Sequence, residues 1–272
     1  MTARPQAPVL DAGRTRGPRA ASALLLTVAS VLGLAMFCWP LVASVLPRSS
    51  GQSAPWLVLV LLPVLLVLVL AQLGSDGLDA RSLAMLGVLC AVNAALRLVS
   101  AGAGGIELVF FLLVLAGYVF GPTFGFLLGA LSLFASALLT AGVGPWLPFQ
   151  MFAAGWIGLG AGALGNLLAG RVRPRGRREL AALAVYAVVV AYVFGALMNL
   201  WFWPFALGGD TRISYVPGGG LAENLRRFVT FTLVTSLPWD TVRAVTNVVA
   251  VVVLGRPVLG TLRRARRRGS FG

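Results

Sequence analysis

The chain is dominated by long apolar stretches, each of roughly the length that crosses a lipid bilayer. A membrane-spanning helix needs about 20 mostly apolar residues, and it satisfies its backbone hydrogen bonds internally because the bilayer offers no partners. Only 11% of the residues are charged, against about a quarter in soluble domains. We therefore predict an all-α, polytopic membrane protein with eight spans, at residues 21–46, 56–72, 80–98, 106–120, 122–141, 150–170, 179–203 and 227–255.

Two boundaries among these stretches need interpretation. The first stretch follows a basic segment, as the apolar region of a signal peptide does, but residues 21–46 greatly exceed the length of about 7–15 residues typical of a cleaved signal. We interpret it as a retained span. The fourth and fifth stretches are separated only by Gly121 and Pro122, which indicates a tight helical hairpin rather than one long rod.

The distribution of arginine predicts an orientation in the membrane. Cytoplasmic loops are enriched in Lys and Arg, and every basic residue of this chain is an arginine. With the N-terminus inside, sixteen arginines fall on inner segments and four on outer loops, while Arg97 and Arg243 lie within spans. Both termini are therefore predicted to be cytoplasmic. The basic tails, 1–20 and 259–272, either anchor this topology or contact anionic lipid or a cytoplasmic partner, and the net charge of +14 does not require nucleic acid.

Small residues recur at helical spacing in three stretches. Gly87, Ala91 and Ala95 share one face of the third stretch, with Ala84 beside them, and small side chains at this spacing let another helix approach closely. We predict that this face is a docking surface. The fifth and sixth stretches carry similar stripes, which we predict to pack these two helices together: Gly121, Gly125 and Gly129 in the former, Gly158 and Gly162 in the latter.

Polar side chains within spans are costly and indicate functional positions. Five segments send such groups, or tryptophans, to the predicted outer layer. The connector "GVGPWLPFQ" lies there too, with Trp146 held between two prolines. One interpretation is a substrate pocket in which Trp146 forms a rigid wall above Gln150, and the other is an interfacial aromatic belt; we favour the pocket. The candidate binding residues in this layer are Asn93, Arg97, Glu107, Trp146, Gln150, Asn199 and Trp203, with Trp201 beside them.

The eighth stretch adds Asp240 and Arg243, three residues apart on one helical face, as a self-neutralising ion pair. Counted from Arg227, Asp240 is expected near the middle of the bilayer, beyond a helix break at Pro238, and Asn247 continues the same face. The pair is either a structural tie between helices or the floor of a polar cavity. The preceding loop, residues 204–226, is long enough to be a lid, and it equally fits a flexible linker.

Two absences restrict the chemistry. The chain has no His and no Lys, which rules out HExxH and Ser-His-Asp sites as well as a Walker A motif. We predict no enzymatic activity, no cofactor and no metal, so a transport role must draw its energy from a partner or an ion gradient. Cys38 and Cys90 both fall in apolar segments, where they are expected to be buried small side chains rather than a disulfide or metal pair.

From about Arg81 to Leu259 the chain resembles the substrate-binding S components of energy-coupling factor (ECF) vitamin transporters. The resemblance is carried by "RSLAMLGVLCAVNAALRL" and the loop "SAGAGGIE", then by "GPTFGFLLGALSLFASALLTAGVGPWLPFQM" and "GWIGLGAGALG". It implies a six-helix substrate-binding core, residues 79–258, preceded by a two-helix extension, residues 21–78, that the family pattern lacks.

The resemblance also implies partners and a substrate. The ligand would be a vitamin or related micronutrient captured from outside, and the partners a transmembrane coupling subunit and two cytoplasmic ATPases in a bacterial plasma membrane. Gly87, Ala91 and Ala95 would contact the coupling subunit, and the whole S component would topple to release its cargo inside.

Two alternatives remain at the level of the sequence. One is a stand-alone secondary transporter that uses Asp240 and Arg243 as an ion relay, and the other is a membrane scaffold that binds no ligand. The many tryptophans and few charges of the predicted pocket suit a large, partly planar, mainly uncharged ligand, which a corrinoid and a flavin-like vitamin would both satisfy.

Overall fold

The apolar stretches fold as helices throughout the part of the chain that the computed structural model describes. These residues are 17–43, 80–100, 104, 106–172, 176–206 and 212–268, with a few positions between 60 and 71. No strand occurs among them. The helices are α1 (Gly17–Phe37), α2 (Trp39–Ala43), α5 (Ala80–Ser100), α6 (Val109–Phe120), α7 (Pro122–Leu139), α8 (Leu147–Leu168), α9 (Arg177–Ala206), α10 (Leu221–Thr235) and α11 (Leu237–Arg268).

Five of the described helices are long and apolar enough to cross a membrane, namely α5, α7, α8, α9 and α11. Leu24–Phe37 of α1 and the whole of α6 are shorter apolar helices. The predicted second span, residues 56–72, lies largely outside the described residues, although Leu62 and Leu66 are helical and buried. The all-helical, multi-pass class is thus confirmed, while the count of eight spans and the cytoplasmic termini stay predictions.

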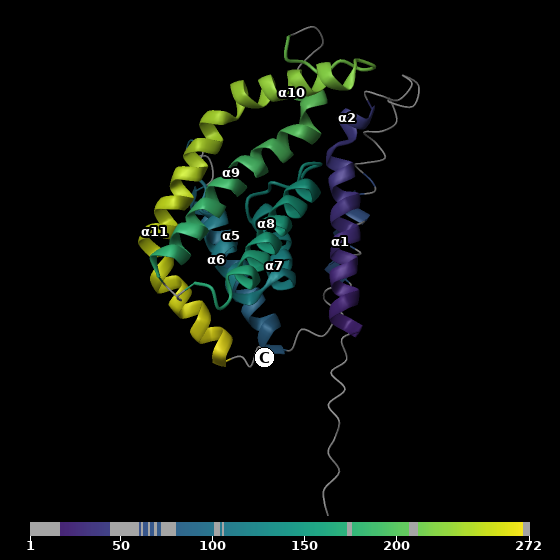
Figure 1. The fold of residues 1–272 in the computed structure, drawn as a ribbon. Helices are drawn as coiled ribbons and strands as arrows, with labels where there is room; N and C mark the ends of the chain where they lie inside the picture. The colour runs from purple at the N-terminus through teal and green to yellow at the C-terminus, as the bar shows by residue number, and fades with distance from the viewer. Residues whose placement is uncertain are drawn as a thin grey trace, which may run out of the picture.

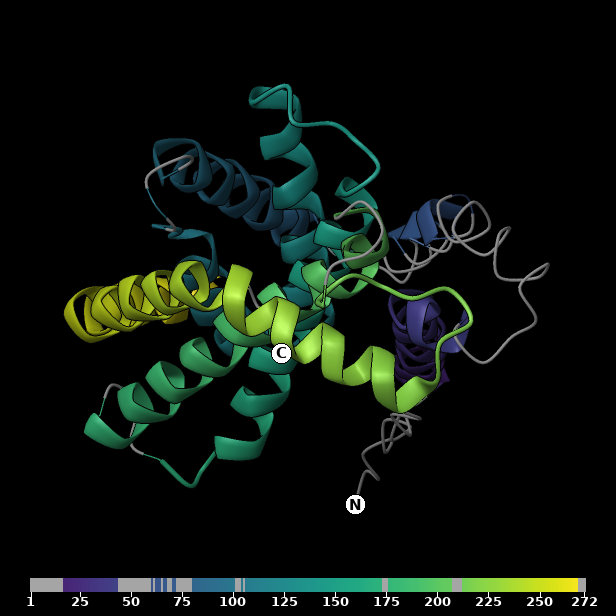
Figure 2. The ribbon, with the colours of Figure 1, turned by 90° about the horizontal axis from the view of Figure 1, so that it is seen from above.

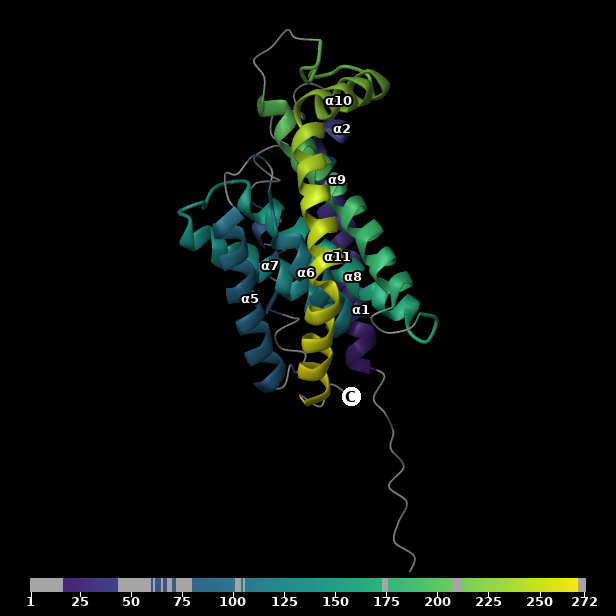
Figure 3. The same cartoon turned by 90° about the vertical axis from the view of Figure 1, so that its left-hand side faces the viewer.

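The long helices form a bundle with α6 at its centre, where nearly every α6 residue is buried. The most extensive packing joins α7 to α8, α6 to α8, α9 to α11 and α5 to α7. α1 stands on one side of the bundle, and α10 runs across one end, close to the end of α9 (Figure 1). Views from above and from the side show the same arrangement (Figures 2 and 3). The beginning of α1 and the end of α11 are both at the opposite end, on different sides of the bundle.

The predicted eighth span, residues 227–255, is wrong in its bounds. The structure divides it at Ser236 into α10, which crosses the end of the bundle, and α11, which runs down one side of the bundle. Pro238 lies in the first turn of α11, where a proline costs no helical hydrogen bond. Asp240 therefore lies in the first turn of α11 and not near the middle of a span. α11 also continues through the basic segment to Arg268, while residues 269–272 lie outside the described part.

The predicted packing of the two glycine-striped helices is confirmed. Gly125 of α7 and Gly158 of α8 face each other so closely that a Cβ on either would overlap the backbone carbonyl of the other. One turn further, a Cβ on Gly129 would overlap the carbonyl of Ala154. In lipid the hydrophobic effect does not drive apolar helices together, so close van der Waals contact between their backbones holds them together instead. This seam fixes the position of α8, from which Gln150 projects.

The predicted hairpin between the fourth and fifth stretches is also confirmed. α6 ends at Phe120 and α7 begins at Pro122, with Gly121 alone between them. Gly121 adopts φ 103°, a backbone conformation that is strained for any residue with a Cβ. The proline then opens α7, a position that suits its fixed φ.

Candidate functional site

The first part of the candidate site joins α5, α7 and α8. The Asn93 side-chain amide donates a hydrogen bond to Ser132 Oγ at 2.9 Å. One turn along α5, the Arg97 guanidinium donates to Ser136 Oγ at 2.7 Å and to Gln150 Oε1 at 3.2 Å. Asn93, Ser132 and Ser136 are buried, and the two serines lie on successive turns of α7. Three helices thus contribute complementary donors and acceptors to one strip.

The second part joins the segment before α6 to the first turns of α11. Arg243 contacts two carboxylates at once, Glu107 at 2.6 Å and Asp240 at 2.5 Å. Its guanidinium also lies over the rings of Phe110 and Phe194, 5.8 and 5.3 Å from their centroids. Cation–π contacts of this kind strengthen where water is excluded. The sequence pattern predicted the pair of Asp240 with Arg243, and the structure adds Glu107 as the second carboxylate.

Two further residues complete this second part. The Asn247 amide donates to the backbone carbonyl of Glu107 at 2.7 Å and so fixes that residue against α11. Gly195 of α9 faces Asp240, and a Cβ at this position would overlap the Asp240 carboxylate. The close approach of α9 and α11 therefore depends on glycine next to the buried acid.

The two parts form one group, which we call the polar network. Arg97 interacts electrostatically with Glu107, which connects the α5 strip to the α11 cluster. The network contains two formal positive and two formal negative charges, so its formal charges balance. Its members are six of the nine predicted binding residues, Asn93, Arg97, Glu107, Gln150, Asp240 and Arg243, together with Ser132, Ser136 and Asn247.

Two acceptors of the polar network have no hydrogen-bond partner among the described residues. They are the side-chain oxygens of Asn93 and Asn247, and both residues are fully buried. A buried polar atom without a partner costs about 1–3 kcal/mol, so native proteins seldom keep one without a reason. Each of these oxygens can accept a hydrogen bond from a donor that enters the network.

Two other predicted binding residues, Asn199 and Trp203, lie in a separate cluster beneath α10. The Asn199 amide donates to Ser236 Oγ at 2.6 Å, and the buried Trp203 indole donates to the Ile213 carbonyl at 2.7 Å. Trp203 also packs against the rings of Tyr215 and Phe228. The structure therefore uses this pair to hold α10 and its preceding loop on the end of α9. Ser236, which Asn199 contacts, also accepts the Asp240 backbone N–H at 2.9 Å and so lies between this cluster and the polar network.

The end of the predicted lid, residues 212–220, is attached to α10. Asn224 accepts a hydrogen bond from the Val216 backbone N–H and donates one to its carbonyl, both at 3.0 Å. Residues 207–211 of this loop lie outside the described part. Burial raises the pKa of the Tyr215 phenol, which packs on Trp203. A lid role for this loop stays an open interpretation.

Trp146 lies apart from both clusters. Its side chain is 41% exposed, and its indole N–H donates to the Gly142 carbonyl at 3.1 Å. The ring folds back over Gly144, where a Cβ would collide with it. Pro148 sits in the first turn of α8, as expected for a residue that begins a helix. The idea that Trp146 walls a pocket above Gln150 stays a prediction.

Trp201, which the sequence places near this layer, is a buried packing residue. Its ring stacks on Phe149 of α8 with centroids 4.4 Å apart. Its indole N–H has no hydrogen-bond partner among the described residues. Through Phe149, which also packs edge-on against Phe37, this stack connects α9 and α8 to α1.

The predicted docking face of α5 is uncovered within the described chain. Gly87, Ala91 and Ala95 are exposed, and a Cβ built on Gly87 meets no described atom within 4 Å. The opposite face of α5, which includes Leu86, Leu89 and Asn93, is buried. The small residues thus lie on the side of α5 that faces away from the bundle.

Sequence reasoning missed an ionic cluster at the other end of the bundle. Glu179, which is buried, binds the Arg263 guanidinium through both carboxylate oxygens and accepts the Tyr118 hydroxyl at 2.8 Å. Arg266 donates to the Val119 carbonyl at 2.7 Å. Glu179 is the one acidic residue in the arginine-rich segment "RVRPRGRRE". An acid among so many arginines was the sequence signal that could have indicated an ion pair here. Two arginines counted only as topology markers therefore fasten α11 to α6 and α9.

Both cysteines of the chain lie within the described residues. Cys38 is partly buried and Cys90 is buried, and both are free thiols. Within the described ranges, no three His, Cys, Asp or Glu side chains group closely enough to hold a metal ion.

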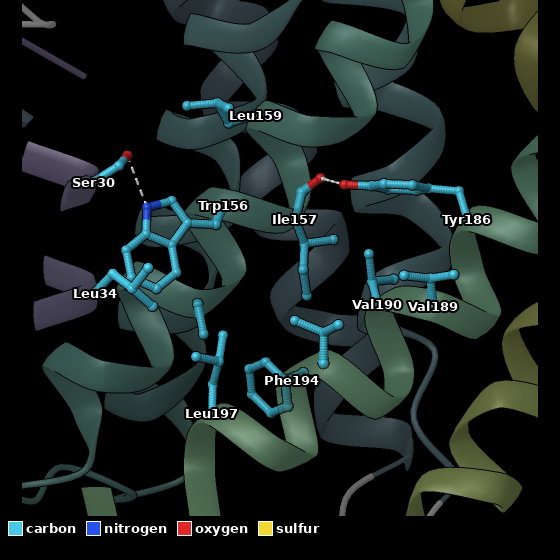
Figure 4. Close-up of a pocket in the computed structure, with 12 residues that line it drawn as sticks. Ser30, Leu34, Trp156, Ile157, Leu159, Tyr186, Val189, Val190, Phe194 and Leu197 are labelled. Atoms are coloured by element: carbon cyan, nitrogen blue, oxygen red, sulfur yellow. Dashed lines mark hydrogen bonds between the residues drawn. The ribbon is translucent and has the colours of Figure 1, made fainter. Parts of the chain in front are cut away.

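A cavity of about 500 Å³ lies elsewhere, between α1, α8 and α9 (Figure 4). Its walls are almost entirely apolar and include Trp156, Ile157 and Val190. None of the nine predicted binding residues lines this cavity. It is therefore a feature distinct from the polar network, although the Phe194 side chain borders both.

Comparison with known families agrees with this geometry. Residues 81–255 match the family described as ECF transporter, substrate-specific component. The match covers more than half of the chain, and the chain belongs to this family. Its role is that of the substrate-specific component of a membrane transporter, which binds a substrate for transport rather than for catalysis. Searches of curated proteins and of solved structures found no match.

Proposed function

We propose that this protein captures a vitamin or related micronutrient from outside the cell and delivers it to the cytoplasm with energy from partner ATPases. The observation that carries the proposal is the polar network, because groups far apart in the sequence meet at one end of the bundle. With the arginine-rich segments inside, that end faces outward, in a bacterial plasma membrane.

The chemistry of the network favours a ligand without a strong net charge. Arg97 and Arg243 are balanced by Glu107 and Asp240, so no unpaired formal charge is available for a highly anionic or cationic molecule. The free oxygens of Asn93 and Asn247 favour a ligand that presents N–H or O–H donors. Vitamins with amide or ring N–H groups, corrinoids and flavin-like molecules among them, meet both conditions.

Three predicted residues outside the network form the proposed rim of the site. Trp146 is exposed at the start of α8, one turn before Gln150, and can fold onto a bound ligand. Asn199 and Trp203 hold the loop and α10, which cross the same end. Movement of α10 away from α9 would open the site, and its return would cover a ligand.

The partners of the transporter are part of the same proposal. The chain has no Lys and so cannot form a Walker A motif, which leaves ATP hydrolysis to two cytoplasmic subunits. The exposed face with Gly87, Ala91 and Ala95 is smooth enough for a helix of the membrane-embedded coupling subunit to pack closely. Binding the substrate and binding the coupling subunit would then use different faces of α5.

Uptake in reconstituted vesicles tests this coupling. Vesicles would hold the chain with the coupling subunit and both ATPases, and candidate vitamins would be supplied outside. Gly87→Leu and Ala91→Leu place bulk on the docking face and should abolish ATP-dependent uptake while ligand binding persists. Ala181→Leu, at an exposed alanine on α9, is the matched control and should keep uptake. Normal uptake by both docking-face variants would refute the docking assignment.

The site itself is tested by ligand binding to the purified protein. Arg97→Met removes the donor to Ser136 and Gln150 and should weaken binding by at least tenfold, which corresponds to about 1.4 kcal/mol. Failure of every vitamin tested to bind the wild-type protein would instead favour a scaffold. Uptake without ATPases that Asp240→Asn abolishes would favour a secondary transporter.

A further inference from the structure

The cavity between α1, α8 and α9 lies outside the polar network and uses a helix that precedes the family match at residues 81–255. The residues that line the cavity come both from α1, before residue 81, and from helices within the matched range. Ser30 and Leu34 belong to α1, while Trp156 and Ile157 belong to α8 and Val190 to α9. The cavity of about 500 Å³ is partly open to the outside, and lining atoms that face no protein neighbour lose dispersion contacts unless something fills it. Such a void calls for an occupant.

The chemistry of the walls rules out a polar occupant. The Trp156 indole N–H donates to Ser30 Oγ at 2.9 Å, and the Tyr186 hydroxyl donates to the Ile157 carbonyl at 2.7 Å (Figure 4). The polar side chains of the lining, Ser30, Trp156 and Tyr186, thus form hydrogen bonds within the protein. All the other lining side chains are hydrocarbon. Water needs two to four polar partners and would find too few here. The same argument applies to a polar micronutrient.

The rim of the cavity is continuous with the apolar outer surface of α9. Val189 and Val193 line the cavity and are 50% and 47% exposed, and Val185, one turn before Val189, is 64% exposed. The floor is buried, since Ile157 and Val190 are almost inaccessible. α9 is long and apolar enough to cross the membrane, and in that position the medium at this rim is lipid. A hydrocarbon chain can therefore enter sideways from the bilayer without passing a polar group.

We propose that this cavity binds one hydrocarbon chain of a membrane lipid, inserted between α1 and the α8–α9 face. The volume lies within the range of about 300–1,000 Å³ that is typical of small-molecule sites. The chain supplies the dispersion contacts that the gap lacks. It also completes the attachment of α1, which the protein itself provides through the Trp156–Ser30 hydrogen bond and the contacts of Phe37 with Phe149 and Trp156. This proposal does not depend on which micronutrient the transporter carries.

Photolabelling in vesicles of phosphatidylethanolamine and phosphatidylglycerol tests the proposal. In one arm the phosphatidylglycerol carries a diazirine near the end of an acyl chain, and in the other the probe is a free fatty acid with the same group. After irradiation, mass spectrometry locates the adducts. We expect adducts on the buried residues Ile157 and Val190, where lipid that merely surrounds the protein cannot reach. The arm that labels them identifies the source as phospholipid or free acid.

Val193→Trp fills the mouth of the cavity and should remove the adducts on Ile157 and Val190. Val185→Trp makes the same change on the same helix outside the lining and should leave them in place. Val189→Trp is a second filling variant at a half-exposed position, in case Val193→Trp fails to yield monodisperse protein. Adducts confined to exposed residues such as Val185 would overturn the proposal. That result would mean that another part of the chain or a second copy keeps lipid away from Ile157 and Val190. Persistence of the buried adducts in both filling variants would overturn it too.

Discussion

The seam between α7 and α8 allows a direct test of how this bundle holds together. Gly158 and Gly125 meet through their backbones, and a methyl group at Gly158 would overlap the Gly125 carbonyl and press on Leu113. Neither obstacle is the flexible end of a long side chain, because the first is backbone and the second lies in the filled core. Gly158→Ala therefore has to push the two helices apart. That movement also weakens the neighbouring contact of Gly129 with Ala154.

The size of the effect follows from two opposing terms. Overfilling a packed interior costs about 1–3 kcal/mol, whereas replacing glycine by alanine within a helix returns about 0.5–1 kcal/mol. Gly87→Ala is the matched control, because a Cβ there meets no described atom within 4 Å and only the helix term applies. Because the helix term is common to both variants, they should differ in free energy of unfolding by the overfilling term alone, about 1–3 kcal/mol, with Gly158→Ala the less stable.

Reversible unfolding in mixed micelles of dodecyl sulfate and a mild detergent, followed by circular dichroism, measures this difference. We expect the midpoint of Gly158→Ala to move to less dodecyl sulfate and that of Gly87→Ala to stay or to move slightly the other way. Equal midpoints for the two variants would refute the claim that backbone contact at the seam holds α7 and α8 together. A large loss in Gly87→Ala would show instead that the α5 face is packed in the isolated protein.

Three further changes test the ionic and polar ties by the same measurement. Arg243→Gln leaves Asp240 buried without its partner and should cost about 3–5 kcal/mol, whereas adding Asp240→Asn should recover part of that loss; additive costs would contradict a coupled pair. Glu179→Gln should destabilise the protein by more than 1.5 kcal/mol, the upper end for a neutral hydrogen bond, because it unpairs the guanidinium. Trp203→Phe removes the donor to the Ile213 carbonyl and should cost about 1–3 kcal/mol, while a neutral effect would mean that α10 is held by other contacts.

The parts of the fold that follow from bilayer physics were predictable from the sequence. Length and apolar content locate membrane helices because the bilayer forces backbone hydrogen bonds to close within each segment. Glycine spacing predicted the contact of α7 with α8 because only residues without a side chain allow backbones to touch. Six predicted polar residues share one network for the related reason that unpaired polar groups are too costly in lipid.

The turn between α10 and α11 could not be located in the same way. Hydropathy reports the free-energy cost of transferring a segment to lipid, but it does not report the direction in which the segment runs. The apolar content of residues 227–255 therefore predicts a single span. The structure places α10 across the end of the bundle, where its partly polar surface suits the boundary. Pro238 was interpreted as an interruption, although the first turn of a new helix accommodates a proline equally well.

Pairing at long range was likewise beyond the sequence. Glu179 and Arg263 are 84 residues apart, and the chain offers many other arginines near the same end. A count of positive charges explains why they lie at that end but cannot select a partner. The orientation of Trp146 has a different origin, since it depends on local loop geometry that lets the indole fold over Gly144. Flanking prolines restrict the backbone and leave the side-chain rotamer open.

The long-range pairs that the sequence missed also bear on how the protein moves. Arg243 ties one end of α11 to the segment before α6, and Arg263 ties the other end to the start of α9. Between them α11 packs on α9 and α6 through residues such as Ala250, Val251 and Gly255. A helix held at both ends by buried ions and in the middle by close packing resists sliding or bending. Reorientation of the whole bundle in the membrane, which the family resemblance implies for substrate release, would then cost fewer internal contacts than opening a path between these helices.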